Sequence, residues 1–165
     1  MQDKIIGYTT GVFDMFHIGH LNVIRRAKEQ CDHLIVGVST DELVEQEKQK
    51  KPVIPFEERV EIVKALRYVD EVVPQPDKDK YAAWERYHFH RMFVGDDWKG
   101  TPQWEGYERQ LAPVGVRIVY LPYTEGVSST KLADVIKHVL TEHPELASET
   151  AGQGPGVCGD DMALK

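Results

Sequence analysis

The stretch KIIGYTTGVFDMFHIGHLNVIRRAKEQC, residues 4–31, joins a short apolar run to an amphipathic one through a loop with two glycines and two histidines. Residues 4–10 have the Ile-rich character of a strand. Leu21, Ile24 and Ala27 recur at the spacing that places side chains on one face of a helix. The stretch therefore predicts a strand, a loop and a helix, which together open a strand–helix–strand unit.

Four more short apolar runs read as strands: 33–40, 71–74, 91–95 and 116–121. Between and after them, helical periodicity places Phe56, Val60, Val63 and Leu66 on one face, and Leu132, Val135, Ile136, Val139 and Leu140 on another. The alternation predicts an α/β fold: a Rossmann-like, doubly wound parallel sheet of five strands, with ligands at the carboxyl ends of the strands. We expect a single domain over residues 1–142 and a loosely ordered tail over 143–165, where periodicity is lost.

The composition of the 165 residues is typical of a water-soluble globular protein, with 41% hydrophobic and 28% charged residues. A net charge of −7 argues against a nucleic-acid binder, which shows a basic face. No apolar run approaches the roughly 20 residues of a membrane helix, so we expect no membrane insertion. Cys31 and Cys158 have neither zinc-site nor disulfide spacing, which favours a cytoplasmic protein.

The loop GVFDMFHIGH, residues 11–20, is the first candidate site. His17 and His20 are three residues apart at a predicted helix start, so they face the same way beside unpaired N–H groups. Two imidazoles there suit a triphosphate, because they can donate hydrogen bonds to oxygens that gain charge during phosphoryl transfer. The alternatives are packing or surface histidines, or a metal pair with Asp14 as the third ligand. Gly19 indicates that something bulky approaches closely.

A second candidate segment, YTEGVSSTK at residues 123–131, follows the last predicted strand and begins the last predicted helix. Three adjacent hydroxyl residues and Lys131 form a phosphate cradle at such a helix start. Taken alone, the segment is equally typical of a well-capped helix. Two such helix starts at one edge of a sheet together favour a site for a phosphorylated ligand.

Three further features carry charge or aromatic groups. The run EQEKQKKP at residues 45–52 is either a solvated charge run or a lysine arm that reaches over the site from the second strand. In GDDWKG at residues 95–100, a flat ring and a carboxylate suit recognition of a base, although the same letters are typical of a turn. Arg67 near a helix end is either a cation at the helix C-terminus or the partner of Asp70, and Arg59 is a weaker candidate.

With these motifs in view, the chain resembles the cytidylyltransferase branch of the HxGH nucleotidyltransferase superfamily, and within it the glycerol-3-phosphate cytidylyltransferases. The resemblance runs from residue 5 to about residue 140, through HIGH, RYVDEV, GDDW and TEGVSSTK in that order. It implies that a phosphomonoester oxygen attacks the α-phosphorus of CTP, releasing pyrophosphate and forming a CDP-alcohol. It also implies a homodimer, with RYVDEV near the contact.

The resemblance implies roles for individual residues. His17, His20, Lys48 and Asp14 are implied as the catalytic group, and Arg67, Tyr123 and Lys50 as contacts of the acceptor. Mg²⁺ or another divalent cation is expected mainly on the triphosphate oxygens, with Asp14 as a candidate ligand. The nucleotide-binding residues implied are Thr10, Gly11, Val12, Phe13, Gly19, Asp97, Trp98, Thr124, Gly126, Ser128, Ser129 and Thr130.

Two departures from the family pattern bear on the acceptor. Tyr123 stands where those enzymes carry an arginine before TEG, and a phenol cannot replace that forked, charged donor. The stretch WKGTPQWEGYERQL, residues 98–111, is rich in aromatic residues and reads either as a hydrophobic plug or as an altered acceptor pocket.

Glycerol 3-phosphate is the leading prediction for the acceptor, with another polyol phosphate or an amino-alcohol phosphate as alternatives. An adenylyltransferase on a sugar phosphate and a catalytically silent nucleotide-binding protein are the other readings. Without a KMSKS loop, a tRNA synthetase fragment is excluded.

Overall fold

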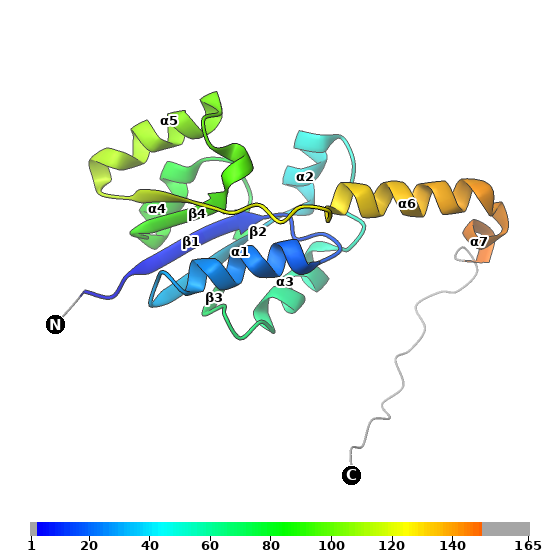
Figure 1. Cartoon of the computed structure of the whole chain (residues 1–165), viewed down its shortest axis with the longest axis horizontal. Helices are drawn as coiled ribbons and strands as arrows, with labels where there is room; N and C mark the ends of the chain where they lie inside the picture. The colour runs from blue at the N-terminus through cyan, green and yellow to red at the C-terminus, as the bar shows by residue number, and fades with distance from the viewer. Residues whose placement is uncertain (1–2, 150–165) are drawn as a thin grey trace, which may run out of the picture. The chain divides into compact units, whose positions relative to one another are not determined.

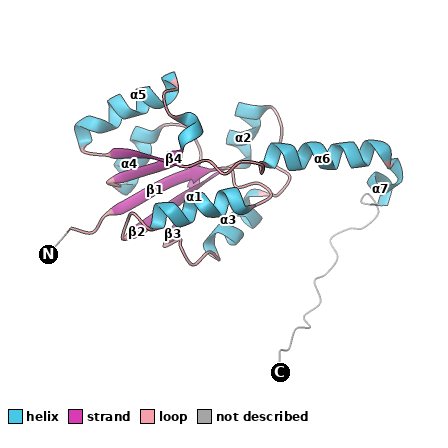
Figure 2. Ribbon diagram, viewed as in Figure 1, coloured by secondary structure: helices cyan, strands magenta, loops and turns pink. Residues whose placement is uncertain are grey.

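A computed structural model describes residues 3–149 and contains one parallel sheet of five strands (Figure 2). The strand order is β3-β2-β1-β4-β5, and every neighbouring pair is parallel. The order reverses on either side of β1, which is the doubly wound arrangement predicted from the sequence. The strands are β1 (Ile6–Gly11), β2 (His33–Ser39), β3 (Glu71–Gln75), β4 (Arg91–Gly95) and β5 (Arg117–Leu121), and all five match predicted strands.

The helices that the periodicity predicted are present, and others join them. Within residues 3–149, four additional α-helices lie where the sequence analysis made no helix prediction. Asp41, Asp79 and Thr101 each precede or begin one of three of them, as helix-start residues do. The helices are α1 (Ile18–Lys28), α2 (Asp41–Lys48), α3 (Phe56–Lys64), α4 (Lys80–Tyr87), α5 (Pro102–Leu111), α6 (Ser129–Glu142) and α7 (Pro144–Glu149), with short 3₁₀ turns at Asp96–Trp98 and Ala112–Val114.

Helices cover both faces of the sheet, as a parallel sheet requires (Figure 1). Apolar side chains pack between the helices and the sheet in two clusters. On one face, α1 and α3 pack through Ile24, Ala27 and Val63. On the other face, α4 and α5 pack through Ala83 and Trp104. Because both faces are covered, the two ends of the strands are the surfaces left for loops, and the carboxyl ends carry the predicted site.

The chain divides into two units, Met1–Ser129 and Thr130–Lys165. The second is described up to residue 149 and contains α7 and all of α6 except its first residue, Ser129. Helix α7 lies in the segment from which the sequence analysis expected no regular element; Pro144 begins it, a position where proline is favoured. The predicted domain boundary at residue 142 stays a prediction. Cys158 and the remainder of the predicted tail lie outside the described residues.

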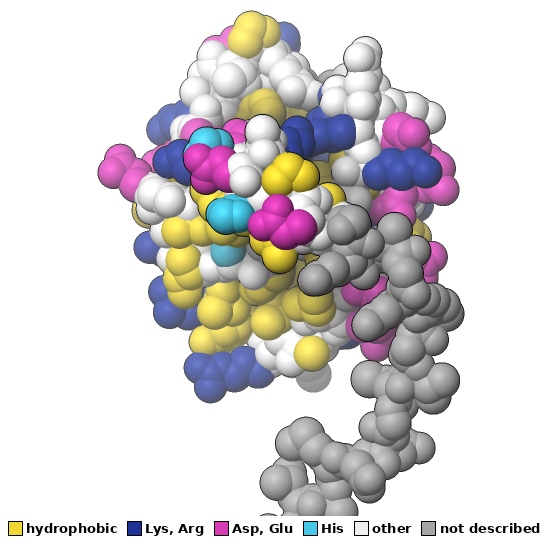
Figure 3. All heavy atoms as spheres, turned by 90° about the vertical axis from the view of Figure 1, so that its right-hand side faces the viewer, with side chains coloured by type: hydrophobic (Ala, Val, Ile, Leu, Met, Phe, Trp, Pro, Cys, Tyr) yellow, Lys and Arg dark blue, Asp and Glu magenta, His cyan; other side chains and the backbone are white. Residues whose placement is uncertain are grey.

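The charge distribution on the surface and the character of the helices can be compared with the expectation that the chain binds neither nucleic acid nor membrane. On the face drawn in Figure 3, acidic and basic side chains of the described residues are interspersed. Within residues 3–149, no helix combines the length and the apolar character needed to cross a bilayer. Cys31 is a free, half-buried thiol.

Candidate active site

The two histidines of the first loop lie together at the start of α1. Their rings stack with centroids 3.8 Å apart and planes 22° apart. His17 caps the helix: its Nδ1 accepts a hydrogen bond from the Gly19 N–H at 3.0 Å, and His20 Nδ1 accepts one from the His17 N–H at 3.2 Å. The pair therefore satisfies two of the N–H groups that a helix start leaves unpaired.

This capping assigns the tautomer of both imidazoles. Burial lowers the pKa of His17, and burial together with the neighbouring His17 lowers the pKa of His20 to about 4, partly offset by Asp14. Both rings are neutral at pH 7, and each Nδ1 accepts a main-chain hydrogen bond, so each proton resides on Nε2. The helix start thus presents two Nε2–H donors.

Gly19 leaves room for the chain's own imidazole: a Cβ built on it would lie 2.8 Å from Cε1 of His17. The expected approach of a ligand to Gly19 stays a prediction. Phe13 and Met15 take positive φ values of 55° and 46°, which turn the loop sharply back toward the helix. Phe13 is buried and its ring contacts His20 edge-on, which fixes the orientation of that imidazole.

Asp14 ties the histidine loop to the lysine-bearing segment. Its two carboxylate oxygens accept hydrogen bonds from the N–H groups of Val53 and Ile54, each at 2.8 Å. Lys48 ends α2, and Lys50 follows in the exposed connection that this tether holds. Asp14 therefore holds the histidine loop to Val53 and Ile54, in the connection that follows the lysine run.

The TEGVSS segment also reaches the histidine loop. Asn22 of α1 donates to Thr124 Oγ1 at 3.0 Å, and Ser129 Oγ donates to the Asp14 carbonyl at 2.6 Å. Gly126 supplies a left-handed turn with φ of 84° between them. The two segments that the sequence analysis selected, over 100 residues apart, therefore meet at one edge of the sheet. Thr130 belongs to the second unit.

The β4 end contributes Asp96, Asp97 and Trp98 in a 3₁₀ turn. Asp96 is tied to the β5 end, because its Oδ1 accepts a hydrogen bond from the Tyr123 N–H at 3.0 Å. Asp97 and Trp98 are exposed, and the side chain of Tyr123 is 50% exposed. These three side chains therefore stand at the surface of the carboxyl edge.

The aromatic stretch after Trp98 is a helix, α5, rather than a loop. Trp104 is buried in the core cluster on the face of the sheet that α4 and α5 cover, with Tyr107 and Tyr120 edge-on against it. The packing interpretation is thereby confirmed for Trp104.

Arg59 has a larger role than the sequence analysis gave it. Its side chain is 0% exposed and donates to the carbonyls of Val12, Ser39 and Ile54 and to the carboxylate of Asp41, at 2.6–2.9 Å. These acceptors come from the ends of β1 and β2, the loop before α3, and the start of α2. The signal was present in the sequence, since position 59 shares the apolar face of Phe56 and Val63.

Lys80 was missed altogether. It begins α4, is 7% exposed, and its ammonium group donates to Thr10 Oγ1 at 3.2 Å. Burial lowers its pKa to about 8. Its place directly after the third strand, at the carboxyl edge, was the available signal.

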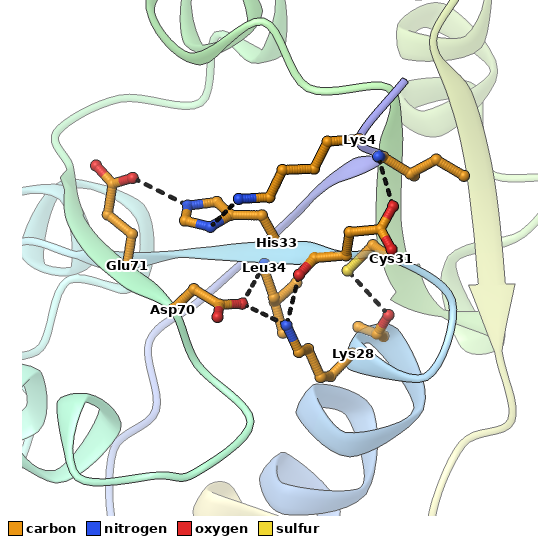
Figure 4. A network of polar contacts seen from close by, with 10 residues as sticks. Lys4, Lys28, Cys31, His33, Leu34, Asp70 and Glu71 are labelled. Carbon is orange, nitrogen blue, oxygen red and sulfur yellow. Dashed lines mark hydrogen bonds and ion pairs between the residues drawn. The ribbon is translucent and has the colours of Figure 1, made fainter. Parts of the chain in front are cut away.

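Arg67 lies at the opposite edge of the sheet, in the turn between α3 and β3. Its guanidinium donates to the Tyr68 hydroxyl at 2.8 Å, so the structure does not support the alternative in which Arg67 pairs with Asp70. Asp70 instead accepts from the Leu34 N–H and from Lys28, both at 2.7 Å (Figure 4). Within one chain, the structure does not bring Arg67 to the histidines.

The described residues contain no cluster of three or more acidic, histidine or cysteine side chains arranged to hold a metal. Asp14, the predicted candidate ligand, already uses each carboxylate oxygen to hold Val53 and Ile54. The donor set therefore does not fit a metal ion held by protein side chains in this part of the chain.

Residues 8–135 match the protein family described as cytidylyltransferase-like. The chain is 40% identical over 134 residues to the glycerol-3-phosphate cytidylyltransferase of Bacillus subtilis, covering 81% of this chain and 96% of that protein. It is 35% identical over 139 residues to an FAD synthase of Pyrococcus horikoshii, covering 82% and 93%. The fold is similar to that of a lipopolysaccharide core biosynthesis protein from Thermoplasma volcanium, with a TM-score of 0.64, 23% identity, and coverage of 74% and 99%. The chain, with its histidine pair at the head of α1, therefore belongs to the cytidylyltransferase-like family of nucleotidyltransferases.

Proposed function

We propose that this protein transfers CMP from CTP to a small alcohol phosphate, with glycerol 3-phosphate as the leading acceptor. An oxygen of the acceptor phosphate forms a bond to the α-phosphorus of CTP. The bond from that phosphorus to the bridging β-oxygen breaks, and pyrophosphate leaves with the electron pair. The product is a CDP-alcohol, the activated form in which such groups enter surface-polymer or lipid headgroup synthesis.

The observation that carries this proposal is the stacked, neutral histidine pair with both Nε2–H donors free of the capping bonds. Neutral donors strengthen their hydrogen bonds as charge builds on the phosphate oxygens, and they lose no proton in doing so. Thr124 Oγ1 accepts from Asn22 of α1, so its O–H remains to donate to the same oxygens, while Ser129 holds the segment to the histidine loop through the Asp14 carbonyl. Catalysis then consists of positioning and charge stabilisation, without a covalent enzyme intermediate.

The cations and exposed aromatic groups complete the proposed site. Lys48 and Lys50 neutralise phosphate charge from the tethered loop, and Asp97 and Trp98 contact the cytidine. Mg²⁺, bound through the triphosphate oxygens, would neutralise charge on the leaving pyrophosphate. Thr10, Gly11, Val12, Phe13, Gly19, Gly126, Ser128 and Thr130 complete the nucleotide-binding group that we propose.

Lys80 is the group that we assign to the acceptor phosphate. It is a buried cation at the carboxyl edge, beside Thr10, and with a pKa of about 8 it is charged at pH 7. Lys80→Met should raise the KM for glycerol 3-phosphate at least tenfold and leave the KM for CTP within twofold. In the unaltered protein, the acceptor KM should rise as the pH increases through 8; an acceptor KM that is flat from pH 7 to 9 would contradict the assignment.

A pyrophosphate-release assay tests the function directly. CTP and ATP are each offered with glycerol 3-phosphate, ribitol 5-phosphate, phosphocholine and phosphoethanolamine. We expect turnover with CTP and a polyol phosphate; no turnover with CTP and any of the four would reject the proposal. ATP is included because a relative at 35% identity is named an FAD synthase, which makes adenylyl transfer the second candidate.

Tyr123 and Arg67 set two further tests. If Tyr123 redirects acceptor choice, Tyr123→Arg should increase kcat/KM for glycerol 3-phosphate relative to the other acceptors.

Arg67 can reach a nucleotide only in the site of a second copy, which fits the homodimer that we propose. Mixing inactive His20→Ala and Arg67→Met chains should then restore part of the activity, because some mixed dimers hold one intact site. No recovery on mixing would remove Arg67 from the proposed site.

A further inference from the structure

A buried hydrogen bond links two strands that are not neighbours in the sheet. The Tyr8 hydroxyl on β1 donates to Oε1 of Gln75 at the end of β3. Strand β2 lies between them in the sheet, and both side chains are buried. A buried hydroxyl and amide that satisfy each other across an intervening strand define the relative position of the two outer strands.

Gly37 on β2 makes this link possible. A Cβ built on Gly37 would lie 2.7 Å from the Tyr8 hydroxyl oxygen and 3.1 Å from Oε1 of Gln75. Any other residue at position 37 would therefore occupy the path of the hydrogen bond.

The link continues into the turn before α4. Nε2 of Gln75 donates to the carbonyl of Asp77, and the Asp77 carboxylate accepts from the Asp79 N–H at 2.9 Å. Asp79 in turn caps α4 by accepting from the Ala82 N–H at 2.9 Å. Each bond fixes the next, and the series ends where α4 begins, at Lys80.

Strand β1 holds this turn at two points. Tyr8 and Thr10 are two residues apart and share one face of the strand, and Lys80 donates to Thr10 while Gln75 accepts from Tyr8. We propose that the Tyr8–Gln75 hydrogen bond is a positioning element that sets the ammonium group of Lys80 for the acceptor phosphate. This inference rests on the acceptor role of Lys80 proposed above.

The variant Tyr8→Phe tests it by removing only the hydroxyl. We expect the KM for glycerol 3-phosphate to rise about fivefold, as loss of one buried hydrogen bond allows, with the KM for CTP and kcat within twofold. A merely structural role would lower the melting temperature and leave the two KM values in their original ratio. Tyr87→Phe is the matched control, since that ring packs against Tyr8 in the same cluster and should leave both KM values unchanged.

A second variant guards against a simple folding defect. Gln75→Ala should raise the acceptor KM by a similar factor, and the double variant should add little to either single change. Fully additive effects would overturn the inference, because two groups that act through one hydrogen bond cannot each lose it.

The titration of Lys80 gives a readout that is independent of turnover. It is measured by labelling the amine with acetic anhydride at increasing pH and quantifying the product by mass spectrometry. Burial and Lys78 lower the pKa of Lys80, while Glu47, Asp77 and Asp79 raise it. If the turn is released in Tyr8→Phe, water reaches the amine and its pKa should rise from about 8 toward 10.5. An unchanged titration with an unchanged acceptor KM overturns the inference. A shifted titration, together with an unaltered acceptor KM in Lys80→Met, upholds the positioning and rejects the acceptor role instead.

Discussion

Histidine and acidic residues lie at both the amino and the carboxyl edge of the sheet, but their hydrogen-bond partners differ. At the amino edge, side chains pair with carboxylates: Lys28 with Asp70 at 2.7 Å, and the His33 Nε2 with Glu71 at 3.4 Å (Figure 4). At the carboxyl edge, the acceptor atoms of His17, His20 and Asp14 are used by main-chain N–H groups. The histidine pair is therefore left with its two Nε2–H donors.

This difference separates His33 from His20, the histidine that we propose to be functional. His33 lies beside a carboxylate, which is an acceptor suited to hold its ring N–H. His20 Nδ1 accepts from the main chain, so its proton resides on Nε2, where we propose that it meets the nucleotide. Residue type alone does not distinguish them; the partner of each ring nitrogen does.

The largest difference between the two edges is expected in kcat, between the variants His20→Asn and His33→Asn. The asparagine amide oxygen can replace Nδ1 as acceptor for the His17 N–H, but it supplies no donor at the place of Nε2. We expect His20→Asn to lower kcat by about 10²-fold or more and to leave the melting temperature nearly unchanged, and His33→Asn to leave kcat within twofold. Equal losses of stability and activity in His20→Asn would favour the packing interpretation of the histidines.

The free energy of unfolding can be compared at the two edges through one arginine at each, Arg59 and Arg91. Arg59→Met removes a buried cation and leaves three carbonyls of the carboxyl-edge loops without their donor, so we expect a loss of about 3 kcal/mol in the free energy of unfolding. Arg91, whose guanidinium donates to the Gln30 carbonyl in an exposed position at the amino edge, is the matched control. Arg91→Met should cost about 1 kcal/mol or less by urea denaturation. Comparable losses in the two variants would mean that Arg59 does not hold the loops together.

The sequence was a good guide wherever a pattern repeats. All five strands and the helices α1, α3 and α6 follow from apolar spacing, because burial on one face imposes that spacing. The histidine loop and the TEGVSS segment could be assigned to one edge because parallel strands place all their carboxyl ends together. Helix α5 was missed because its aromatic residues and Gly106 weakened the helical pattern.

The parts that could not be predicted depend on pairings between distant residues. Nothing local indicates that Asp14 would hold Val53 and Ile54, or that Lys28 rather than Arg67 would pair with Asp70. Lys80 sits in a charged run that reads as solvated, and its burial depends on the packing of α4 and α5 above it. Such pairings are properties of the folded chain, and they decide which polar residues are structural.

Acid should weaken the carboxyl edge first. Because the pKa of His20 is lowered to about 4 from the usual 6.5, the unfolded chain binds a proton between these values and the folded chain does not. Stability is therefore complete above pH 6.5 and falls as the pH drops toward 4, by about 3 kcal/mol in all. Urea midpoints from pH 8 to 4 should show this slope in the unaltered protein and a smaller slope in His20→Asn; the same slope in both would assign the loss to other groups.

The amino edge should respond in a separate and lower window. Partial burial raises the pKa of Asp70, but the Leu34 N–H and Lys28 outweigh it, so the pKa lies below the usual 3.8. A depressed carboxyl pKa contributes stability that is complete above the unfolded value and is lost as the pH falls through the folded one. Asp70→Asn keeps an acceptor for the Leu34 N–H and loses the charge, so at pH 7 we expect a cost of about 0.5 kcal/mol, since the pair is partly exposed. That cost should shrink in about 1 M salt, which screens surface charges, whereas the cost of Arg59→Met should persist because its partners are mostly neutral carbonyls within the loops. If salt reduced both costs equally, the two edges would not differ in the way their hydrogen bonds indicate.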